Sequence, residues 1–304
     1  MKLAAALVLS LIATPALPAP ITAIASFSII GDMVSRVGGD RVEVRTIVGP
    51  NADTHVYEPR PADAAAVASA DIFFINGLGF EGWMGRFVQA TGYAGPLITV
   101  SDGIVAHEMG ESEAHSDDHG HDSDHEHGGI DPHAWQSLVN GKIYVSNIAS
   151  GLCNLDAAGC PTYTANADSY IAQLTALDAE IKTAIAAVPP EKRKLITTHD
   201  AFGYFGDAYG VTFLSPEGTS TEAEPSAADV ARLITQIRQE GVSTVFIENM
   251  ADSRLIKQIA DETGATIGGE LYADALSLPD GPAATYIDMF RSNAGLFIAA
   301  WKEK

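Results

Sequence analysis

The sequence predicts an α/β protein of two lobes, each with a mostly parallel β-sheet covered by helices, joined by one long rigid helix. Three observations lead to this prediction. The chain has 304 residues, which at roughly 150 residues per domain corresponds to about two domains. Short apolar strands alternate with helices in both halves of the chain, a pattern typical of parallel sheets with covered faces. Between the halves lies one long stretch with helical periodicity.

The two halves show a similar succession of elements. In the first half we expect strands at 21–26, 41–48, 71–76 and 96–100 and helices at 28–37 and 61–70. In the second half we expect strands at 194–198, 211–215, 243–248 and 266–269 and helices at 227–240, 253–263 and 283–301. The N-terminal lobe would therefore cover residues 20–160 and the C-terminal lobe residues 191–304.

The linking segment, residues 161–190, carries the long helix. Its apolar residues recur at helical spacing: Tyr163, Tyr170, Ile171, Leu174, Leu177, Ile181 and Ile185. Pro189 and Pro190 end the helix. A helix of about 25 residues is about 38 Å long. We expect so rigid a connection to restrain the large hinge motion that a flexible linker would allow.

Residues 1–19 have the composition of a secretory signal peptide. Lys2 supplies a positive charge, residues 3–13 are nearly all apolar, and small residues and prolines follow. Cleavage after Ala16 and cleavage after Ala19 both fit this pattern. The apolar run is shorter than the ~20 helical residues that cross a bilayer, and no cysteine lies near the cleavage region to carry a lipid. We therefore expect an exported, soluble protein without membrane insertion.

The charge balance excludes some partners. With 39 acidic and 18 basic residues the formal net charge is −21. A nucleic-acid-binding surface needs basic patches for phosphate contacts, so we expect no nucleic-acid partner. The same excess of negative charge disfavours adhesion to anionic membranes.

The two cysteines, Cys153 and Cys160, are close together in the sequence. In an oxidising compartment they are expected to close a small loop as a structural disulfide. The alternative is two independent buried thiols. A redox role is not expected, because the spacing is not Cys-x-x-Cys.

A histidine-rich acidic segment occupies residues 102–131. It contains ten acidic residues, six histidines and no lysine or arginine, and this low complexity predicts a disordered loop. Imidazole and carboxylate groups together suit divalent metals, so the loop is an expected auxiliary site of weak metal capture; the alternative is a solvating spacer. Besides His107, its histidines are His115, His119, His121, His125 and His127.

The other three histidines are His55, His133 and His199. His55 and His199 come just after expected strands, and His133 opens an apolar segment. Ligands of open α/β sheets gather beyond the carboxyl ends of the strands, so the three side chains could converge. Taken singly, each of them fits a capping or core histidine better than a ligand.

Five ordered motifs bear a family resemblance. They are Asp53-Thr-His55-Val-Tyr57-Glu-Pro59, Asp131-Pro-His133-Ala-Trp135, Thr198-His199-Asp-Ala-Phe-Gly-Tyr204-Phe, Glu224-Pro-Ser226 and Leu271-Tyr-Ala-Asp274-Ala-Leu-Ser277. Together they closely resemble the cluster A-I metal-binding solute-binding proteins of ABC transporters, the zinc-specific branch in particular. The resemblance covers essentially the whole mature chain. It implies two α/β lobes bridged by one long helix, with the metal in the cleft between the lobes.

The resemblance also implies the metal ligands, which fall on His55, His133, His199 and Asp274. Manganese-type relatives carry a carboxylate at the third position, where this chain has His199. Three imidazoles and one carboxylate suit tetrahedral Zn²⁺, whereas Mn²⁺ prefers more oxygen ligands. The alternatives for Asp274 are a water molecule as fourth ligand and a helix-capping role for the side chain.

Ligating histidines usually donate their second ring N–H to a carboxylate or carbonyl. Glu58, Asp131, Asp200 and Glu248 are candidates for this role, and the sequence favours none of them.

The implied function is that of a periplasmic zinc-binding component of an ABC importer. It would bind Zn²⁺ in the cleft and deliver it to the membrane permease, with the His-rich loop assisting metal acquisition. The resemblance also allows a periplasmic zinc-donor protein as a partner, and we expect a monomer. The alternative is a periplasmic zinc buffer or chaperone without a dedicated transporter.

We expect no enzymatic activity. The fragment His125-Glu-His127 lacks the second histidine of a His-Glu-x-x-His zinc hydrolase. Four protein ligands would also leave no open position for an activated water.

Overall fold

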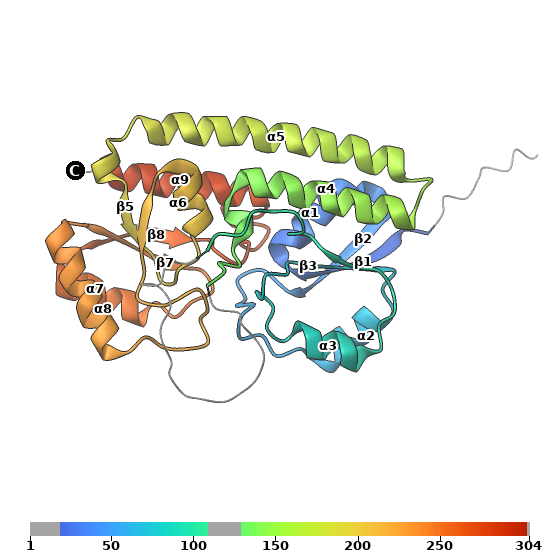
Figure 1. Cartoon of the computed structure of the whole chain (residues 1–304), viewed down its shortest axis with the longest axis horizontal. Helices are drawn as coiled ribbons and strands as arrows, with labels where there is room; N and C mark the ends of the chain where they lie inside the picture. Colours follow the sequence, from blue (N-terminus) through green and yellow to red (C-terminus); the bar gives the residue numbers. More distant parts are fainter. Residues whose placement is uncertain (1–18, 109–128, 303–304) are drawn as a thin grey trace, which may run out of the picture.

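Two four-stranded β-sheets form the two lobes (Figure 1), and the predicted fold class is confirmed. The computed structural model describes residues 19–108 and 129–302. The strand order is β2-β1-β3-β4 in the N-terminal lobe and β6-β5-β7-β8 in the C-terminal lobe, and all neighbouring strands are parallel. The two lobes therefore repeat one topology, and in each sheet the carboxyl ends of all four strands lie at the same edge.

The elements follow in alternating order along the chain. The N-terminal lobe contains β1 (Ile21–Phe27), α1 (Ser28–Gly38), β2 (Val42–Val48), α2 (Pro61–Ala68), β3 (Ile72–Ile75), α3 (Met84–Thr91), β4 (Leu97–Thr99) and α4 (Leu138–Leu155). The C-terminal lobe contains β5 (Lys194–Ile196), α6 (Gly203–Tyr209), β6 (Thr212–Leu214), α7 (Ala227–Glu240), β7 (Thr244–Glu248), α8 (Arg254–Thr263), β8 (Thr266–Leu271) and α9 (Tyr286–Lys302). Short 3-10 helices lie at Gly39–Arg41, Ala134–Gln136 and Pro190–Lys192.

The long helix α5 (Cys160–Ala186) runs along the molecule beside both lobes (Figure 1). It has 27 residues and begins before the expected position, because Pro161 is well suited to the first turn of a helix. Near its start, Asn166 Nδ2 donates to the carbonyl of Val37 in the N-terminal lobe. Towards its end, Asp178 Oδ1 accepts the hydroxyl of Tyr209 from the C-terminal lobe. The helix is thus fastened to both lobes. The predicted disulfide, Cys153–Cys160, joins it to α4.

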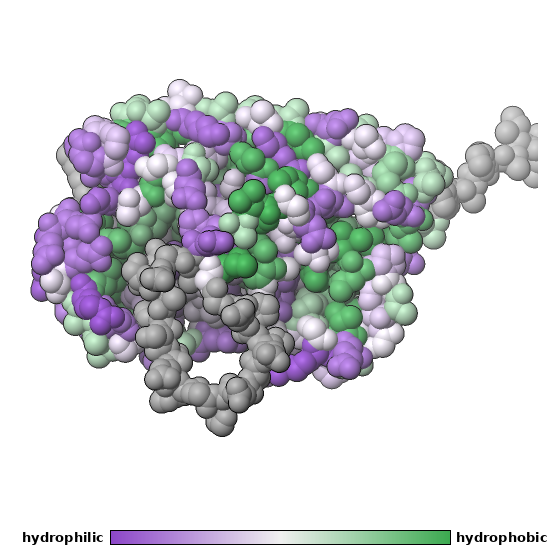
Figure 2. All heavy atoms as spheres, in the orientation of Figure 1, coloured by the Kyte–Doolittle hydropathy of each residue, from purple (hydrophilic) through white to green (hydrophobic). Residues whose placement is uncertain are grey.

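One apolar core continues from lobe to lobe. It includes Phe27 from β1, Trp135, and Phe297 from α9. A second, smaller core lies under α7 and α8 and includes Ile237 and Ile256. These two helices are amphipathic, and over them the face seen in Figure 2 is covered mainly by hydrophilic side chains. The shared core packs the two lobes against each other.

Direct hydrogen bonds also join the lobes. The indole N–H of Trp135 donates to the carbonyl of Ala273 at 2.9 Å, and the hydroxyl of Tyr286 donates to the carbonyl of Trp135. The N–H of Leu276 donates to Ser28 Oγ at 3.0 Å. These buried contacts lie beside the site described below.

The expectation that residues 102–131 form a disordered loop is wrong at both ends of this range. Glu108 pairs with Ile130 in an isolated antiparallel bridge, and the N–H of Asp131 donates to the carbonyl of His107 at 3.0 Å. The N–H of His107 donates to the hydroxyl of Tyr204 in the C-terminal lobe. Composition could not reveal these contacts because they depend on groups distant in the sequence. The rest of the loop lies outside the described residues, with His115, His119, His121, His125 and His127, as does most of the predicted signal peptide.

Helices α3, α4 and α6 were not among the predicted elements. A search of the described helices for one long and apolar enough to cross a membrane finds none.

Candidate metal centre

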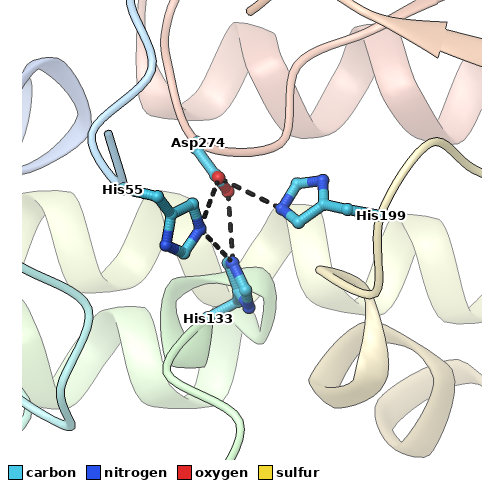
Figure 3. Close-up of side chains that lie close together, drawn as sticks. All are labelled: His55, His133, His199 and Asp274. Atoms are coloured by element: carbon cyan, nitrogen blue, oxygen red, sulfur yellow. Dashed lines mark hydrogen bonds and ion pairs between the residues drawn. The ribbon is translucent and has the colours of Figure 1, made fainter. Parts of the chain in front are cut away.

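Four side chains from both lobes converge between the sheets (Figure 3). His55 lies beyond the end of β2, His199 beyond the end of β5 and Asp274 beyond the end of β8. His133 comes directly before the 3-10 helix Ala134–Gln136. In parallel sheets these loops gather at the same edge, as the sequence predicted.

The four side chains are within reach of a single ion. Nε2 of His55 and Nε2 of His199 each lie 3.2 Å from Oδ2 of Asp274. Nε2 of His133 lies 3.5 Å from Oδ1 of Asp274 and 3.4 Å from Nε2 of His55. One ligand atom from each of the four lies within 4.8 Å of the others. This is the only such group of three or more His, Cys, Asp or Glu side chains among residues 19–108 and 129–302.

Burial makes this cluster of polar and charged groups energetically unfavourable when no cation is bound. His133, His199 and Asp274 are fully buried, and His55 is 7% exposed. Within residues 19–108 and 129–302, Nε2 of His199 and both oxygens of Asp274 make no hydrogen bond of acceptable geometry. A buried carboxylate without hydrogen bonds is unfavourable by several kcal/mol unless a positive charge compensates it, so a carboxylate surrounded by three imidazole nitrogens fits a cation between them.

Carboxylates hold the second ring nitrogen of two of the histidines. Nδ1 of His133 lies 2.7 Å from Oδ1 of Asp131, which also accepts the N–H of His133. Nδ1 of His199 lies 2.5 Å from Oε2 of Glu248, while Oε1 of Glu248 accepts the N–H of Thr198. Each carboxylate fixes the ring so that Nε2 points into the site. These two partners were among the four candidates that the sequence left undecided.

His55 is held differently. Its ring packs edge-on against Phe80, with centroids 4.8 Å apart. Its N–H donates to Oδ1 of Asp53 at 2.9 Å. The side chain borders an 830 Å³ cavity that is also lined by Tyr57 and Trp83. His55 is thus the most accessible of the four side chains.

The charges within the site shift the pKa values strongly. Burial alone would lower the pKa of His133, but Asp274 and Asp131 outweigh it and raise it to about 9. Burial is likewise outweighed at His199, where Glu248 and Asp274 hold the pKa well above its usual value. Burial opposes ionisation of Asp274, yet the positive charges of His199 and His133 hold its pKa well below its usual range. These shifts all favour positive charge beside the buried carboxylate of Asp274.

Three further residues bear on the sequence predictions for this site. Asp274 caps no helix, since the next helix begins at Tyr286, so that alternative role is wrong. Nδ1 of His107 lies 2.7 Å from Oδ2 of Asp207, outside the four-residue group. Phe80 was missed, because an apolar residue in a loop gives no sequence signal for contact with a distant histidine.

Known proteins resemble the chain over nearly its full length. Residues 24–300 match the family described as zinc-uptake complex component A, periplasmic. The manganese-binding lipoprotein MntA of Halalkalibacterium halodurans is 32% identical over 276 residues, which cover 91% of this chain and 87% of the relative. The iron-binding protein YfeA of Yersinia pestis is 34% identical over 269 residues, covering 88% and 81%.

Solved structures show the same fold. A manganese-bound periplasmic metal-binding protein of Candidatus Liberibacter asiaticus superimposes with a TM-score of 0.80 at 32% identity, covering 92% of this chain and 99% of that one. The periplasmic zinc-binding protein TroA of Treponema pallidum gives a TM-score of 0.82 at 28% identity, covering 93% and 99%. The metals named for these similar proteins differ from one to another.

Proposed function

The chain belongs to the family of periplasmic zinc-uptake components A and is a metal-binding substrate-binding component of an ABC transporter, and from this premise we propose that its cargo is Zn²⁺. The ion would be bound by His55, His133, His199 and Asp274 between the lobes and delivered to the membrane permease. One observation carries the proposal: three imidazole nitrogens and a carboxylate face one another in a buried site, and the carboxylate has no hydrogen bond of acceptable geometry to the part of the chain that the structure describes.

The donor set favours zinc over harder ions. Zn²⁺ prefers four nitrogen, sulfur or oxygen ligands in a tetrahedron, whereas Mn²⁺ prefers more oxygens. With bonds of about 2.0–2.1 Å, the ligand atoms of a tetrahedral Zn²⁺ are separated by about 3.3–3.4 Å. The separations of 3.2 Å from Oδ2 of Asp274 to Nε2 of His55 and of His199, and of 3.4 Å between Nε2 of His55 and Nε2 of His133, are close to this value. Asp274 is the only carboxylate in the group, which disfavours an oxygen-rich site.

The identity of the bound metal needs a direct test, because it differs among the similar proteins. Similar proteins are named for manganese and iron as well as zinc. A competitive titration with Zn²⁺ and Mn²⁺ should give much tighter binding of Zn²⁺ to the wild type. The variant His199→Glu, which adds a second carboxylate, should narrow the difference between the two metals. Equal affinities for both metals in the wild type would contradict the zinc assignment.

The geometry supports binding rather than catalysis. A site closed by four protein ligands leaves no position for a reactive water, and release of an unchanged ion to a permease needs none. Family membership also favours the importer component over a free-standing zinc buffer.

The proposal also gives the His-rich segment a role. We assign to His115, His119, His121, His125 and His127 an auxiliary role in collecting metal, because imidazoles and carboxylates together bind divalent ions. At the described start of this segment, the N–H of His107 donates to the hydroxyl of Tyr204 in the C-terminal lobe. At its described end lies Asp131, whose carboxylate holds the ring of His133.

The protein would act in the periplasm after removal of residues 1–19. The Cys153–Cys160 disulfide is consistent with an oxidising compartment.

A further inference from the structure

His55 is the least restrained of the four metal-site side chains. It is the most accessible of them, and it borders the 830 Å³ cavity. His133 and His199 have a carboxylate on Nδ1; within the described residues, the polar contacts of the His55 ring are made through Nε2, to Asp274 and His133. Besides the packing of its ring against Phe80, His55 is held in the site by a hydrogen bond to its backbone N–H.

Asp53 supplies that restraint. Its Oδ1 accepts the N–H of His55 at 2.9 Å. Its Oδ2 accepts the hydroxyl of Thr221, in the opposite lobe, at 2.7 Å. One carboxylate therefore joins the backbone of His55 to the C-terminal lobe.

A second contact fastens the base of the same loop. The N–H of Asn51 donates to the carbonyl of Leu276 at 3.0 Å, and Asn249 Nδ2 donates to Oδ1 of Asn51 at 2.9 Å. Asn51 has a positive φ of 54°, a conformation that asparagine tolerates better than most residues. Because Asn249 directly follows β7, the partner of the Asn51 side chain is held at the end of a strand.

Thr221, in contrast to Asn249, does not lie at the end of a strand. It lies in the connection between β6 and α7, which contains no regular helix or strand from 215 to 226. Such connections open at lower free energy than strands do. Asp53 and Thr221 also line a 450 Å³ cavity between the lobes, together with the acidic Glu217 and Glu224. The Asp53–Thr221 contact thus borders a cavity and joins the N-terminal lobe to the more easily displaced element.

We propose that the Asp53–Thr221 hydrogen bond is an inter-lobe latch that sets how long the bound metal stays, with Asp53 and Thr221 acting as positioning residues for His55. While the latch is closed, the backbone of His55 is fixed and its Nε2 stays beside Asp274. When the connection 215–226 moves away, Asp53 loses its tie to the C-terminal lobe and His55 can turn towards the 830 Å³ cavity. The inference rests on the proposed function, since it concerns the lifetime of an ion at that site.

The change Thr221→Val tests the latch, because it removes the hydroxyl with little change in shape. Both partners are only partly buried, so water can solvate Asp53 in the variant and folding should be unaffected. The dissociation rate of Zn²⁺ is measured by mixing the loaded protein with excess chromophoric chelator. We expect the rate to rise about tenfold, which corresponds to about 1.4 kcal/mol and lies near the lower end for a hydrogen bond to a charged group.

Two further variants make the test specific. Thr221→Ser restores the hydroxyl and should return the rate to that of the wild type. Thr235→Val is the matched control: Thr235 is exposed on α7, and its hydroxyl donates within the helix to Ala231. The control should release zinc at the wild-type rate, and all variants should keep the wild-type melting temperature without metal.

A wild-type rate in Thr221→Val would overturn the latch, as would an equal rise in Thr235→Val. Failure of the latch leaves the proposed function intact as long as the wild type binds one zinc tightly at equilibrium. A wild type without tight zinc binding would overturn both proposals.

Discussion

Nδ1 of His199 lies 2.5 Å from Oε2 of Glu248, and both groups are fully shielded from solvent. The other oxygen of Glu248 accepts the backbone N–H groups of Thr198 and His199. A single carboxylate thus fixes both the backbone and the ring of the histidine. Because β7, which ends in Glu248, is the neighbour of β5 in the sheet, the sheet order itself brings the two residues together.

Glu248→Gln should weaken zinc binding by roughly 10- to 100-fold, the usual cost of losing an outer carboxylate partner of a ligating histidine. The amide keeps the size of the side chain but removes its charge. Competitive titration against a chelator of known affinity measures the effect. Glu180→Gln, at an exposed position on α5, is the control and should bind as the wild type does. Unchanged affinity in Glu248→Gln would show that the contact does not support the site.

His55→Ala and His133→Ala should each lower zinc affinity by more than Glu248→Gln does, because each removes a direct ligand rather than its support. Asp274→Ala should be milder if a water molecule takes the vacant position. Isothermal titration of the three variants gives the comparison. A variant at His55 or His133 that keeps the wild-type affinity would remove that residue from the proposed ligand set.

The metal-free and metal-bound proteins should respond oppositely to pH. Burial lowers the pKa of His133, but Asp274 and Asp131 raise it to about 9, above the reference value of 6.5. A raised histidine pKa stabilises the folded metal-free protein below pH 6.5, and this contribution is lost as the pH rises towards 9. Metal binding strengthens over the same range, since protons compete less for the imidazoles.

Thermal unfolding at pH 6.5 and at pH 9, with and without zinc, measures this difference. The melting temperature of the metal-free protein should fall with rising pH, while the increase caused by zinc should grow. An increase that shrinks between these two pH values would contradict the assignment of His133 as a ligand that must lose a proton.

Replacing both cysteines, Cys153→Ser with Cys160→Ser, should lower the free energy of unfolding by about 2–3 kcal/mol, as chain entropy predicts for so short a loop. Zinc affinity should stay the same, because the disulfide joins the last turns of α4 to the start of α5, whereas His133 precedes the opposite end of α4. Figure 1 shows this α4–α5 junction at the end of the N-terminal lobe that is remote from the C-terminal lobe. Chemical denaturation and zinc titration of the same variant check the two expectations. A parallel loss of affinity would mean that the α4–α5 junction influences the site.

The sequence predicted much of the fold because most strands are short apolar runs with clear ends. The helix Ala227–Glu240 agrees residue for residue. Helix α6 was missed because it has only seven residues and contains Gly203 and Gly206, which leave almost no helical periodicity to detect. The beginning of α5 was placed too late because its first buried apolar residue, Tyr163, follows the actual start at Cys160.

The site was predictable to the extent that its residues follow strand ends or match a family motif. His55, His133, His199 and Asp274 were named in advance, and the structure brings these four side chains together. The choice of Glu248 over its competitors depends on which strands are neighbours, and local sequence does not carry that information. The contact between Asp53 and Thr221 spans 168 residues and had no sequence signal.

The most direct test is a competitive zinc titration of the chain without residues 1–19, beside two variants. One variant lacks residues 115–127, and the other carries His199→Ala. We expect the deletion variant to keep one tightly bound zinc and His199→Ala to lose it. Loss of tight binding in the deletion variant, with retention in His199→Ala, would place the principal site in the His-rich segment and contradict the inter-lobe metal centre.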